Sequence, residues 1–344
     1  MNILGRLAAV TALSITATSA TAQTTAAVSA TEVPNTVSPE TAAQLKFVYG
    51  FMAKKPGPRP TSPAEWDRQA KQNEAAILPL VDGVVKPLNI SYKTETIGRV
   101  PVLRIRPTNY RPGQVLIYVH GGGYVSFSAR SSLVQAALIA NATGDEVISI
   151  DYTLAPHGKF QIVTDQVLSV WRELLANGVT PSNTGMFGDS AGGGLAAGSV
   201  LKMRDKGLPL PGALWLLSPW SDITQTGDTY TTLAAADPTL DAESLSWAAD
   251  AYAAPEDQKN PYASPVYGDY SKAFPPTLIQ VGLREIFLST AVRHYQAIRS
   301  GGHEAVLDAY EGMPHVFQAI VSNTVESKTA VARAAAFFRE HLKP

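Results

Sequence analysis

The chain has 344 residues, a formal net charge of −1 and an ordinary globular composition, 45% hydrophobic and 17% charged. No block of lysine and arginine marks a surface for nucleic acid or for an anionic membrane, so we expect a small neutral ligand. The lack of cysteine excludes a thiolate nucleophile, disulfides, iron–sulfur clusters and cysteine-ligated zinc. This length fits one α/β domain with additions.

The first 22 residues have the pattern of a secretory signal peptide. Arg6 precedes a short apolar run, and the small residues Ala20-Thr21-Ala22 stand before Gln23. The alternative is an amphipathic N-terminal helix. No cysteine follows the small residues to carry a lipid anchor, and no other segment approaches the roughly 20 apolar residues of a membrane span. We therefore expect cleavage near Ala22 and a secreted or periplasmic protein without a stable membrane anchor.

The next segments predict a linker and a helix. Residues 23–40 are small, polar and proline-containing, as linkers are. A helix is expected over 41–54, within an N-terminal segment that covers 41–85. The main domain is expected over 86–344, with an insertion near 221–256.

Apolar runs alternate with helical patterns from about residue 89 onward, which predicts an α/β fold with a mostly parallel sheet covered on both faces. Strands are expected at 89–96, 101–106, 115–119, 146–150, 184–187, 213–217, 277–281 and 304–310. Helices are expected near 131–142, 162–176, 190–205, 241–253, 288–300 and 324–342. The insertion near 221–256 follows a strand end, so it would lie over the carboxyl edge of the sheet, where ligands bind in such folds. With residues 41–85 it could form a lid.

The run Gly188-Asp-Ser190-Ala-Gly192 follows a strand and opens a helix, which is the context of a nucleophile elbow. The glycines are needed because side chains beside the serine would collide in so sharp a turn. The helix start behind Ser190 also directs amide N–H groups at any anion that forms there. By itself the motif is also compatible with simple packing or with a phosphate cradle.

A second glycine-rich run, His120-Gly121-Gly122-Gly123-Tyr124, directly follows the strand at 115–119. Consecutive glycines let backbone N–H groups approach a substrate oxygen, which is how an oxyanion hole is built. The rival interpretation is a dinucleotide-binding loop, but the spacing is not G-x-G-x-x-G and Asp151 comes late for the ribose acid.

These two motifs give the chain a resemblance to the hormone-sensitive-lipase family of esterases, the HGGG and GDSAG group. Asp151-Tyr-Thr-Leu-Ala-Pro156, Ser218-Pro-Trp-Ser-Asp222 and Asn260-Pro-Tyr-Ala-Ser-Pro265 are also similar to family motifs and occur in the same order. The resemblance covers roughly 89–342. It implies an α/β-hydrolase catalytic domain over 86–344 and a helical cap over the site, which residues 41–85 and the insertion near 221–256 match in position. It also implies esters of short to medium acyl chains as substrates.

The base is expected to be His315. It follows the last predicted strand within the loop Glu311-Gly-Met-Pro-His315, from which it could reach a serine on a neighbouring strand. The order serine, acid, histidine is that of α/β-hydrolases. The other five histidines lie in less suitable places, namely His120, His157, His294, His303 and His341.

The acid is where the sequence departs from the family. The resemblance implies D-x-L-x-D after the penultimate strand, whereas this chain has Glu285 at the first acidic position and Ser289 at the second. Glutamate can orient and charge-balance an imidazole as aspartate does, with a small backbone adjustment for its extra methylene. We therefore expect Glu285 as the acid, with Asp222 as its competitor.

The predicted function is hydrolysis of carboxylic esters through an acyl-enzyme. Ser190 is the nucleophile, and the N–H groups of Gly121, Gly122 and Ala191 form the oxyanion hole, with Gly123 as an alternative donor. No cofactor or metal is expected, because H-E-x-x-H and clustered ligands are absent from the sequence. A lactonase, amidase or deacetylase would use the same machinery. A non-catalytic small-molecule receptor normally loses the base or the nucleophile, and both are present here.

Overall fold

A computed structural model describes residues 29–52 and 57–343, and the predicted signal peptide lies outside them. Eight strands form one sheet in the order β1-β2-β4-β3-β5-β6-β7-β8. β2 pairs antiparallel with β1 and with β4, and all other neighbours are parallel. The mostly parallel sheet is therefore confirmed. The strands are β1 (Ser91–Ile97), β2 (Val100–Arg106), β3 (Val115–Val119), β4 (Glu146–Ile150), β5 (Thr184–Asp189), β6 (Ala213–Leu217), β7 (Thr277–Gly282) and β8 (Ala305–Tyr310).

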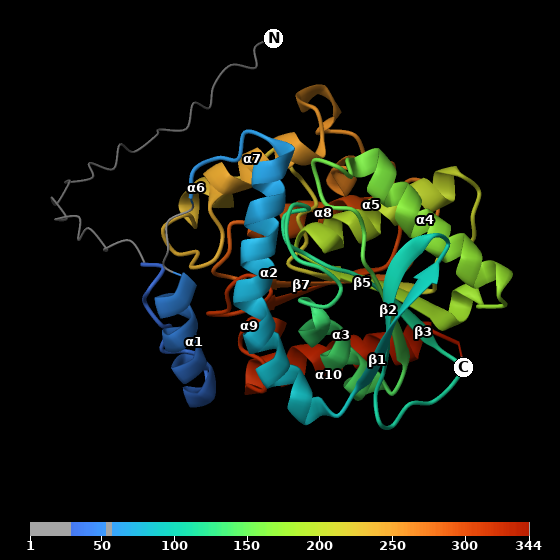
Figure 1. The fold of residues 1–344 in the computed structure, drawn as a ribbon, viewed down its shortest axis with the longest axis horizontal. Coiled ribbons are helices and arrows are strands. Elements are labelled where there is room, and N and C mark those ends of the chain that lie inside the picture. Colours follow the sequence, from blue (N-terminus) through green and yellow to red (C-terminus); the bar gives the residue numbers. More distant parts are fainter. Residues whose placement is uncertain (1–28, 53–56, 344) are drawn as a thin grey trace, which may run out of the picture.

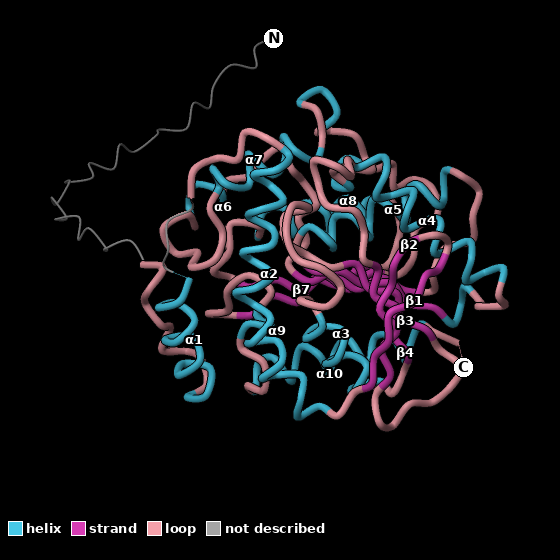
Figure 2. Tube along the Cα trace, viewed as in Figure 1, coloured by secondary structure: helices cyan, strands magenta, loops and turns pink. Residues whose placement is uncertain are grey.

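Helices cover both faces of this sheet (Figure 1). α3 (Leu133–Thr143) and α10 (Val325–His341) lie on one face, and α4 (Phe160–Ala176), α5 (Ala191–Asp205) and α8 (Leu288–Ser300) lie on the other. Each face carries its own cluster of buried apolar side chains. The central strands β4, β5, β6 and β7 are buried along their whole length and are mostly apolar. The reason is that helices cover both of their faces, as the magenta strands within the cyan helices of Figure 2 illustrate.

The remaining helices belong to the cap segments and to the last loop. They are α1 (Pro39–Met52), α2 (Pro63–Val85), α6 (Thr229–Thr232), α7 (Ala242–Tyr252) and α9 (Phe317–Ile320), with short 3₁₀ turns at Lys86–Leu88, Pro181–Asn183, Pro255–Asp257 and Pro265–Tyr267. Among the residues that the structure describes, no helix has both the length and the apolar character that a bilayer crossing requires.

α2 has no counterpart among the predicted elements. Its buried side chains are few and Pro79 lies inside it, so its apolar periodicity is weak. The sequence at its start nevertheless has the pattern of a helix N-terminus. The Ser62 side chain accepts a hydrogen bond from the Glu65 amide, and Pro63 occupies the first helical position. α2 then contacts the glycine-rich loop after β3, where Asn73 Nδ2 donates to Ser126 Oγ at 3.0 Å.

The predicted linker over residues 23–40 needs a correction, because its described part is bound to the body of the protein. The Arg284 guanidinium donates to the carbonyl oxygens of Ser29 and Glu32. The Glu326 carboxylate accepts from the Ser38 amide at 2.6 Å, and the helix α1 already begins at Pro39. Polar composition suggested a free linker, but these polar groups have partners about 250–290 residues away in the chain.

Candidate active site

The predicted site residues gather at the carboxyl edge of the sheet, where parallel strands leave their loops. The glycine-rich loop begins directly after β3, Ser190 directly after β5, and Glu285 three residues after β7. His315 lies five residues after β8. The strands β3, β5, β6, β7 and β8 are successive neighbours in the sheet. The candidate site residues therefore all lie along one row of adjacent strand ends.

Ser190 has the strained backbone of a nucleophile elbow. Its φ of 53° and ψ of −124° lie outside the regions that L-residues readily adopt. Two hydrogen bonds hold this conformation: the Ser190 amide donates to Leu217 O at 2.8 Å, and the Trp220 amide donates to Ser190 O at 2.8 Å. The serine side chain is thereby fixed between β5 and α5, at the start of the helix.

Gly192 explains why the elbow needs a glycine on its helical side. A Cβ atom at this position would lie 2.1 Å from Val119 O and 2.4 Å from His120 O. The first turn of α5 therefore packs directly on the end of β3. This contact brings the nucleophile and the glycine-rich loop together.

Glu285 and His315 form a buried pair. Glu285 Oε2 lies 2.6 Å from His315 Nδ1, which leaves Nε2 as the nitrogen available to a substrate or to the serine. Glu285 has no exposed surface and His315 is 7% exposed. Within the described residues no hydrogen bond joins the Ser190 hydroxyl to His315; such contacts are often long in unliganded sites and tighten with substrate.

Ser218 supports this pair, and the sequence analysis assigned it no role. Its hydroxyl donates to Glu285 Oε1 at 2.7 Å and accepts from the Val316 amide at 3.0 Å. The Gly282 amide also donates to Glu285 Oε1, at 2.7 Å. The signal that could have found Ser218 is its place directly after β6, in line with the ends of β5 and β7.

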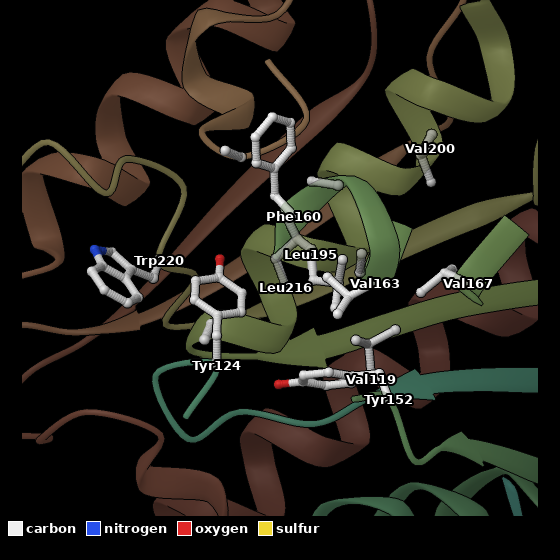
Figure 3. Packing of buried hydrophobic residues seen from close by; sticks show 14 of the residues in the cluster. Val119, Tyr124, Tyr152, Phe160, Val163, Val167, Leu195, Val200, Leu216 and Trp220 are labelled. Atoms are coloured by element: carbon white, nitrogen blue, oxygen red, sulfur yellow. The ribbon is translucent and has the colours of Figure 1, made fainter. Parts of the chain in front are cut away.

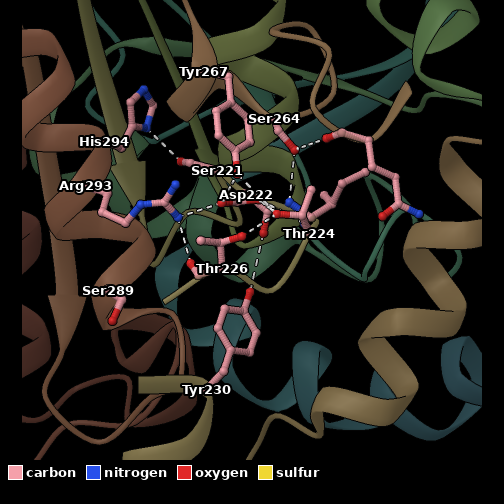
Figure 4. Close-up of polar contacts among 12 residues, drawn as sticks. Ser221, Asp222, Thr224, Thr226, Tyr230, Ser264, Tyr267, Ser289, Arg293 and His294 are labelled. Carbon is pink, nitrogen blue, oxygen red and sulfur yellow. Dashed lines mark hydrogen bonds and ion pairs between the residues drawn. The ribbon is translucent and has the colours of Figure 1, made fainter. Parts of the chain in front are cut away.

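Asp222, the competing acid, lies in a different network (Figure 4). Its carboxylate contacts Arg293 Nη1 at 2.6 Å and the Tyr267 hydroxyl at 3.0 Å, and it accepts from the amide and hydroxyl of Thr224. The side chain is fully buried. These contacts tie the loop after β6 to α8, and none of them involves His315.

The glycine-rich loop requires one change among the expected oxyanion donors. The Gly121 amide donates to Asp189 Oδ1 at 3.0 Å, so its N–H already has an acceptor. The Tyr118 hydroxyl donates to the same oxygen. Burial raises the pKa of the Asp189 carboxyl, although these hydrogen bonds favour its charged form. Gly121 is therefore replaced by Gly123 as a candidate donor.

The N–H groups of Gly122, Gly123 and Ala191 remain as candidates. None of the three makes a hydrogen bond to another described residue. Ala191 is the first residue of α5, where helix geometry leaves an N–H group without an intrahelical partner. Gly122 and Gly123 have φ values of 106° and 62°, which only glycine adopts without strain.

A row of stacked aromatic side chains connects α7 with His315. Tyr252 of α7 stacks on Tyr124 at 3.5 Å between ring centroids, Tyr124 on Trp220 at 5.5 Å, and Trp220 on Phe287 at 5.8 Å. Phe287 meets the His315 ring edge-on at 5.1 Å. Figure 3 shows Tyr124 and Trp220 side by side. The His315 ring is therefore packed against an apolar row that reaches the insertion after β6.

No cluster of three or more His, Asp or Glu side chains within residues 29–52 and 57–343 has the arrangement to hold a metal ion. The chemistry that the described groups can perform is nucleophilic. A strained serine lies at a helix start, and a histidine paired with a carboxylate lies near it. The N–H groups of Gly122, Gly123 and Ala191, unpaired among the described residues, belong to the segments that directly follow β3 and β5.

Comparison with known proteins identifies the family. The sequence pattern of the α/β-hydrolase fold matches residues 116–319. An acetyl-hydrolase of Streptomyces hygroscopicus is 33% identical over 244 residues, 71% of this chain and 81% of that protein. An esterase of Acinetobacter venetianus is 30% identical over 225 residues, 65% of this chain and 74% of that protein. The crystal structure of an esterase from the bacterial hormone-sensitive lipase family superposes with a TM-score of 0.80 and 34% identity, covering 89% of this chain and 99% of that one.

The fold and the site thus define an α/β-hydrolase. Within that class, the chain belongs to the hormone-sensitive-lipase family of esterases.

Proposed function

We propose that this carboxylesterase hydrolyses short- to medium-chain acyl esters through Ser190, His315 and Glu285. The observation that carries the proposal is the 2.6 Å contact between Glu285 Oε2 and His315 Nδ1, beside a serine held in the elbow conformation. Relatives include an ethyl acetate hydrolase of Pseudomonas putida, 27% identical over 327 residues, which supports a small ester as substrate.

In the proposed reaction, Ser190 Oγ attacks the acyl carbon while His315 Nε2 takes the hydroxyl proton. The oxygen of the tetrahedral intermediate accepts hydrogen bonds from Gly122, Gly123 and Ala191. The intermediate collapses and the alcohol leaves with the proton from His315. Water, deprotonated by His315, then attacks the acyl-enzyme, and the acid is released.

The buried aromatic row supports the limit on acyl length. Tyr252, Tyr124, Trp220 and Phe287 stack in an unbroken row of buried rings that ends at the His315 ring, and we infer that this fixed row restricts the length of the acyl chain. Initial rates on aryl esters from acetate to palmitate test this limit, with lactones and anilides alongside. We expect the highest kcat/KM on acetate to hexanoate. A preference for palmitate would contradict the limit, and faster turnover of lactones or anilides would contradict the substrate class.

The nucleophile is tested by Ser190→Ala. This change removes one hydroxyl and leaves the elbow backbone in place, so we expect esterase activity to fall by about four decades or more at an unchanged melting temperature. Labelling by a phosphonate or sulfonyl fluoride should stop as well, and chelators should have no effect. Near-normal activity in Ser190→Ala, or activity lost to a chelator, would overturn the proposal.

We also propose that residues 1–22 direct export. The support is the charged start, the apolar run and the small residues before Gln23. N-terminal sequencing of protein from the native host should find a mature end at or near Gln23. Recovery of the chain with Met1 from a cytoplasmic fraction would refute export.

A further inference from the structure

Ile286, the residue after Glu285, is held on both of its backbone groups by side chains of the insertion after β6. The Ile286 amide donates to Asp237 Oδ2 at 2.8 Å, and the Thr229 hydroxyl donates to Ile286 O at 2.7 Å. All three residues are buried. Two side chains of the insertion, those of Asp237 and Thr229, thus bind the amide N–H and the carbonyl oxygen of Ile286. We call this pair of hydrogen bonds the Ile286 clamp.

Asp237 is itself oriented for this contact. Its second oxygen, Oδ1, accepts from the Thr239 and Leu240 amides at 2.8 and 2.9 Å, and from the Thr239 hydroxyl at 2.8 Å. The turn at 237–240 therefore fixes the carboxylate, which leaves Oδ2 for Ile286. A buried carboxylate satisfied in this way is a rigid support.

Thr229 is tied to the same region through Ser289, the residue at the family's second acidic position. The Thr229 amide donates to Ser289 Oγ at 3.1 Å, and the Ser289 amide donates to Thr229 Oγ1 at 3.0 Å. Ser289 Oγ in turn donates to Asp228 Oδ1. A carboxylate of the insertion, that of Asp228, thus contacts the serine at position 289.

The other end of the Glu285 loop is held differently. The Leu283 amide donates to Tyr310 O and the Arg284 amide to Met313 O, each at 3.0 Å. The start of the loop is thus attached to the chain that leads to His315, whereas its end is attached to the insertion. Glu285 lies between these two attachments, and its carboxylate must stay within hydrogen-bond reach of His315 Nδ1.

We propose that Thr229 and Asp237 are positioning residues, which act through the Ile286 clamp to set the Glu285 carboxylate against His315. The inference rests on the proposed role of Glu285 as the acid. It makes the insertion at 221–256 part of the catalytic scaffold, because a displacement of about 1 Å at a catalytic group can lower the rate about 100-fold.

The experiment compares Thr229→Val with Thr229→Ser, using p-nitrophenyl butyrate. Valine has the shape of threonine but no hydroxyl, so the Ile286 carbonyl loses its donor. We expect kcat to fall about tenfold or more while KM stays within about twofold, since the loss lies in the transition state. Serine keeps the hydroxyl and should retain kcat within about threefold. Unchanged kcat in Thr229→Val would overturn the inference.

Thr290→Val is the matched control. Thr290 is fully buried beside Ser289, and its hydroxyl has no hydrogen-bond partner among the described residues. The same isosteric change should therefore leave kcat within about twofold. An equal loss in Thr290→Val would show that any change in this region lowers the rate, which overturns the inference. Asp237→Asn provides a second test of the clamp if Thr229→Val fails to fold, and it should lower kcat with the same small effect on KM.

A double-mutant cycle separates this inference from the proposed function. If the clamp acts through Glu285, Thr229→Val should add no more than about a twofold loss in a Glu285→Gln background. A full tenfold loss in both backgrounds overturns the clamp and leaves the triad standing. Wild-type kcat in Glu285→Gln alone overturns the acid assignment, and the clamp with it.

Discussion

The Glu285 carboxylate is held by hydrogen bonds on both of its oxygens. Its Oε1 accepts from Ser218 and from the Gly282 amide, so the carboxylate is held on one side and presents Oε2 to His315. Three contacts to one carboxylate fix its orientation as well as its charge. The longer side chain is therefore compatible with a short contact to the imidazole.

The comparison of Glu285→Gln with Asp222→Asn tests which carboxylate serves the base. Glutamine keeps the size but removes the charge that stabilises the imidazolium, and it favours the wrong imidazole tautomer. We expect kcat to fall by about three to four decades, as for the equivalent change in a serine protease. Glu285→Asp should retain more activity, because the charge survives.

Asp222→Asn should act through stability, since its partner Arg293 would remain half-buried without its carboxylate. Rates must be compared at temperatures well below both melting transitions. A near-normal rate in Glu285→Gln together with a loss of three decades in folded Asp222→Asn would transfer the role of the acid to Asp222.

At the scale of elements, the site depends on how closely α5 approaches the end of β3. The helix starts at Ala191, and the Gly192 backbone touches the carbonyl oxygens of Val119 and His120. The Asp189 carboxylate fastens the same loop from the other side, through the Gly121 amide. Ser190 and the glycine-rich loop are therefore held together by direct packing of α5 on the end of β3.

Gly192→Ala should break this packing. The added methyl would lie 2.1 Å from Val119 O, and neither backbone can retreat without displacing the sheet or the helix. We expect a loss of about 3 kcal/mol or more in the free energy of unfolding, at the upper end of overpacking effects. Thermal unfolding followed by circular dichroism measures it.

Gly83→Ala is the control for the preceding change. Gly83 is exposed in the last turn of α2, and a Cβ there would have nothing within 4 Å. Alanine should stabilise the protein by about 0.5–1 kcal/mol, because glycine loses more backbone entropy in a helix. A wild-type melting temperature in Gly192→Ala would contradict the close approach of α5 and β3.

At the scale of the whole molecule, buried polar contacts join segments that are distant in sequence. Nδ1 of His294 in α8 lies 2.7 Å from the Ser221 hydroxyl, and Nε2 lies 2.6 Å from the Tyr270 hydroxyl. The Tyr270 hydroxyl donates to Pro265 O, so Nε2 carries the ring proton. Because burial lowers the pKa of His294, the imidazole is neutral at pH 7, so Nδ1 accepts from Ser221. The ring links the segment after β6 with the segment before β7.

Acidification should destabilise the protein through His294. Burial lowers the pKa of His294 to about 3, whereas an unfolded histidine has a pKa of about 6.5. The unfolded state therefore binds the extra proton first, and stability is lost as the pH falls from about 6.5 towards 3. The slope from this residue is about 1.4 kcal/mol per pH unit.

Denaturant unfolding at pH 7, 6, 5 and 4 measures this slope. His294→Gln should be less stable at pH 7 but should lose less stability on acidification, because no imidazole remains to be protonated. Equal slopes in wild type and His294→Gln would show that other groups account for the acid sensitivity.

The sequence by itself determined the sheet, most of its helices and the two loops of the site. Continuous apolar strands and glycine-rich turns at strand ends are local features, because the sterics of neighbouring residues fix them. Ser190 and the glycine-rich run after β3 could be found in this way, as could the place of His315 after the last strand.

Only the tertiary structure decided which polar groups meet. Glu285 depends on Ser218, 67 residues away, and the Gly121 amide is taken by Asp189, 68 residues away. The docking of residues 29–38 likewise depends on Arg284 and Glu326. A hydrogen bond is directional and short-ranged, so the packing of strands and helices in space decides which groups become partners. Periodicity along the chain cannot predict such pairs.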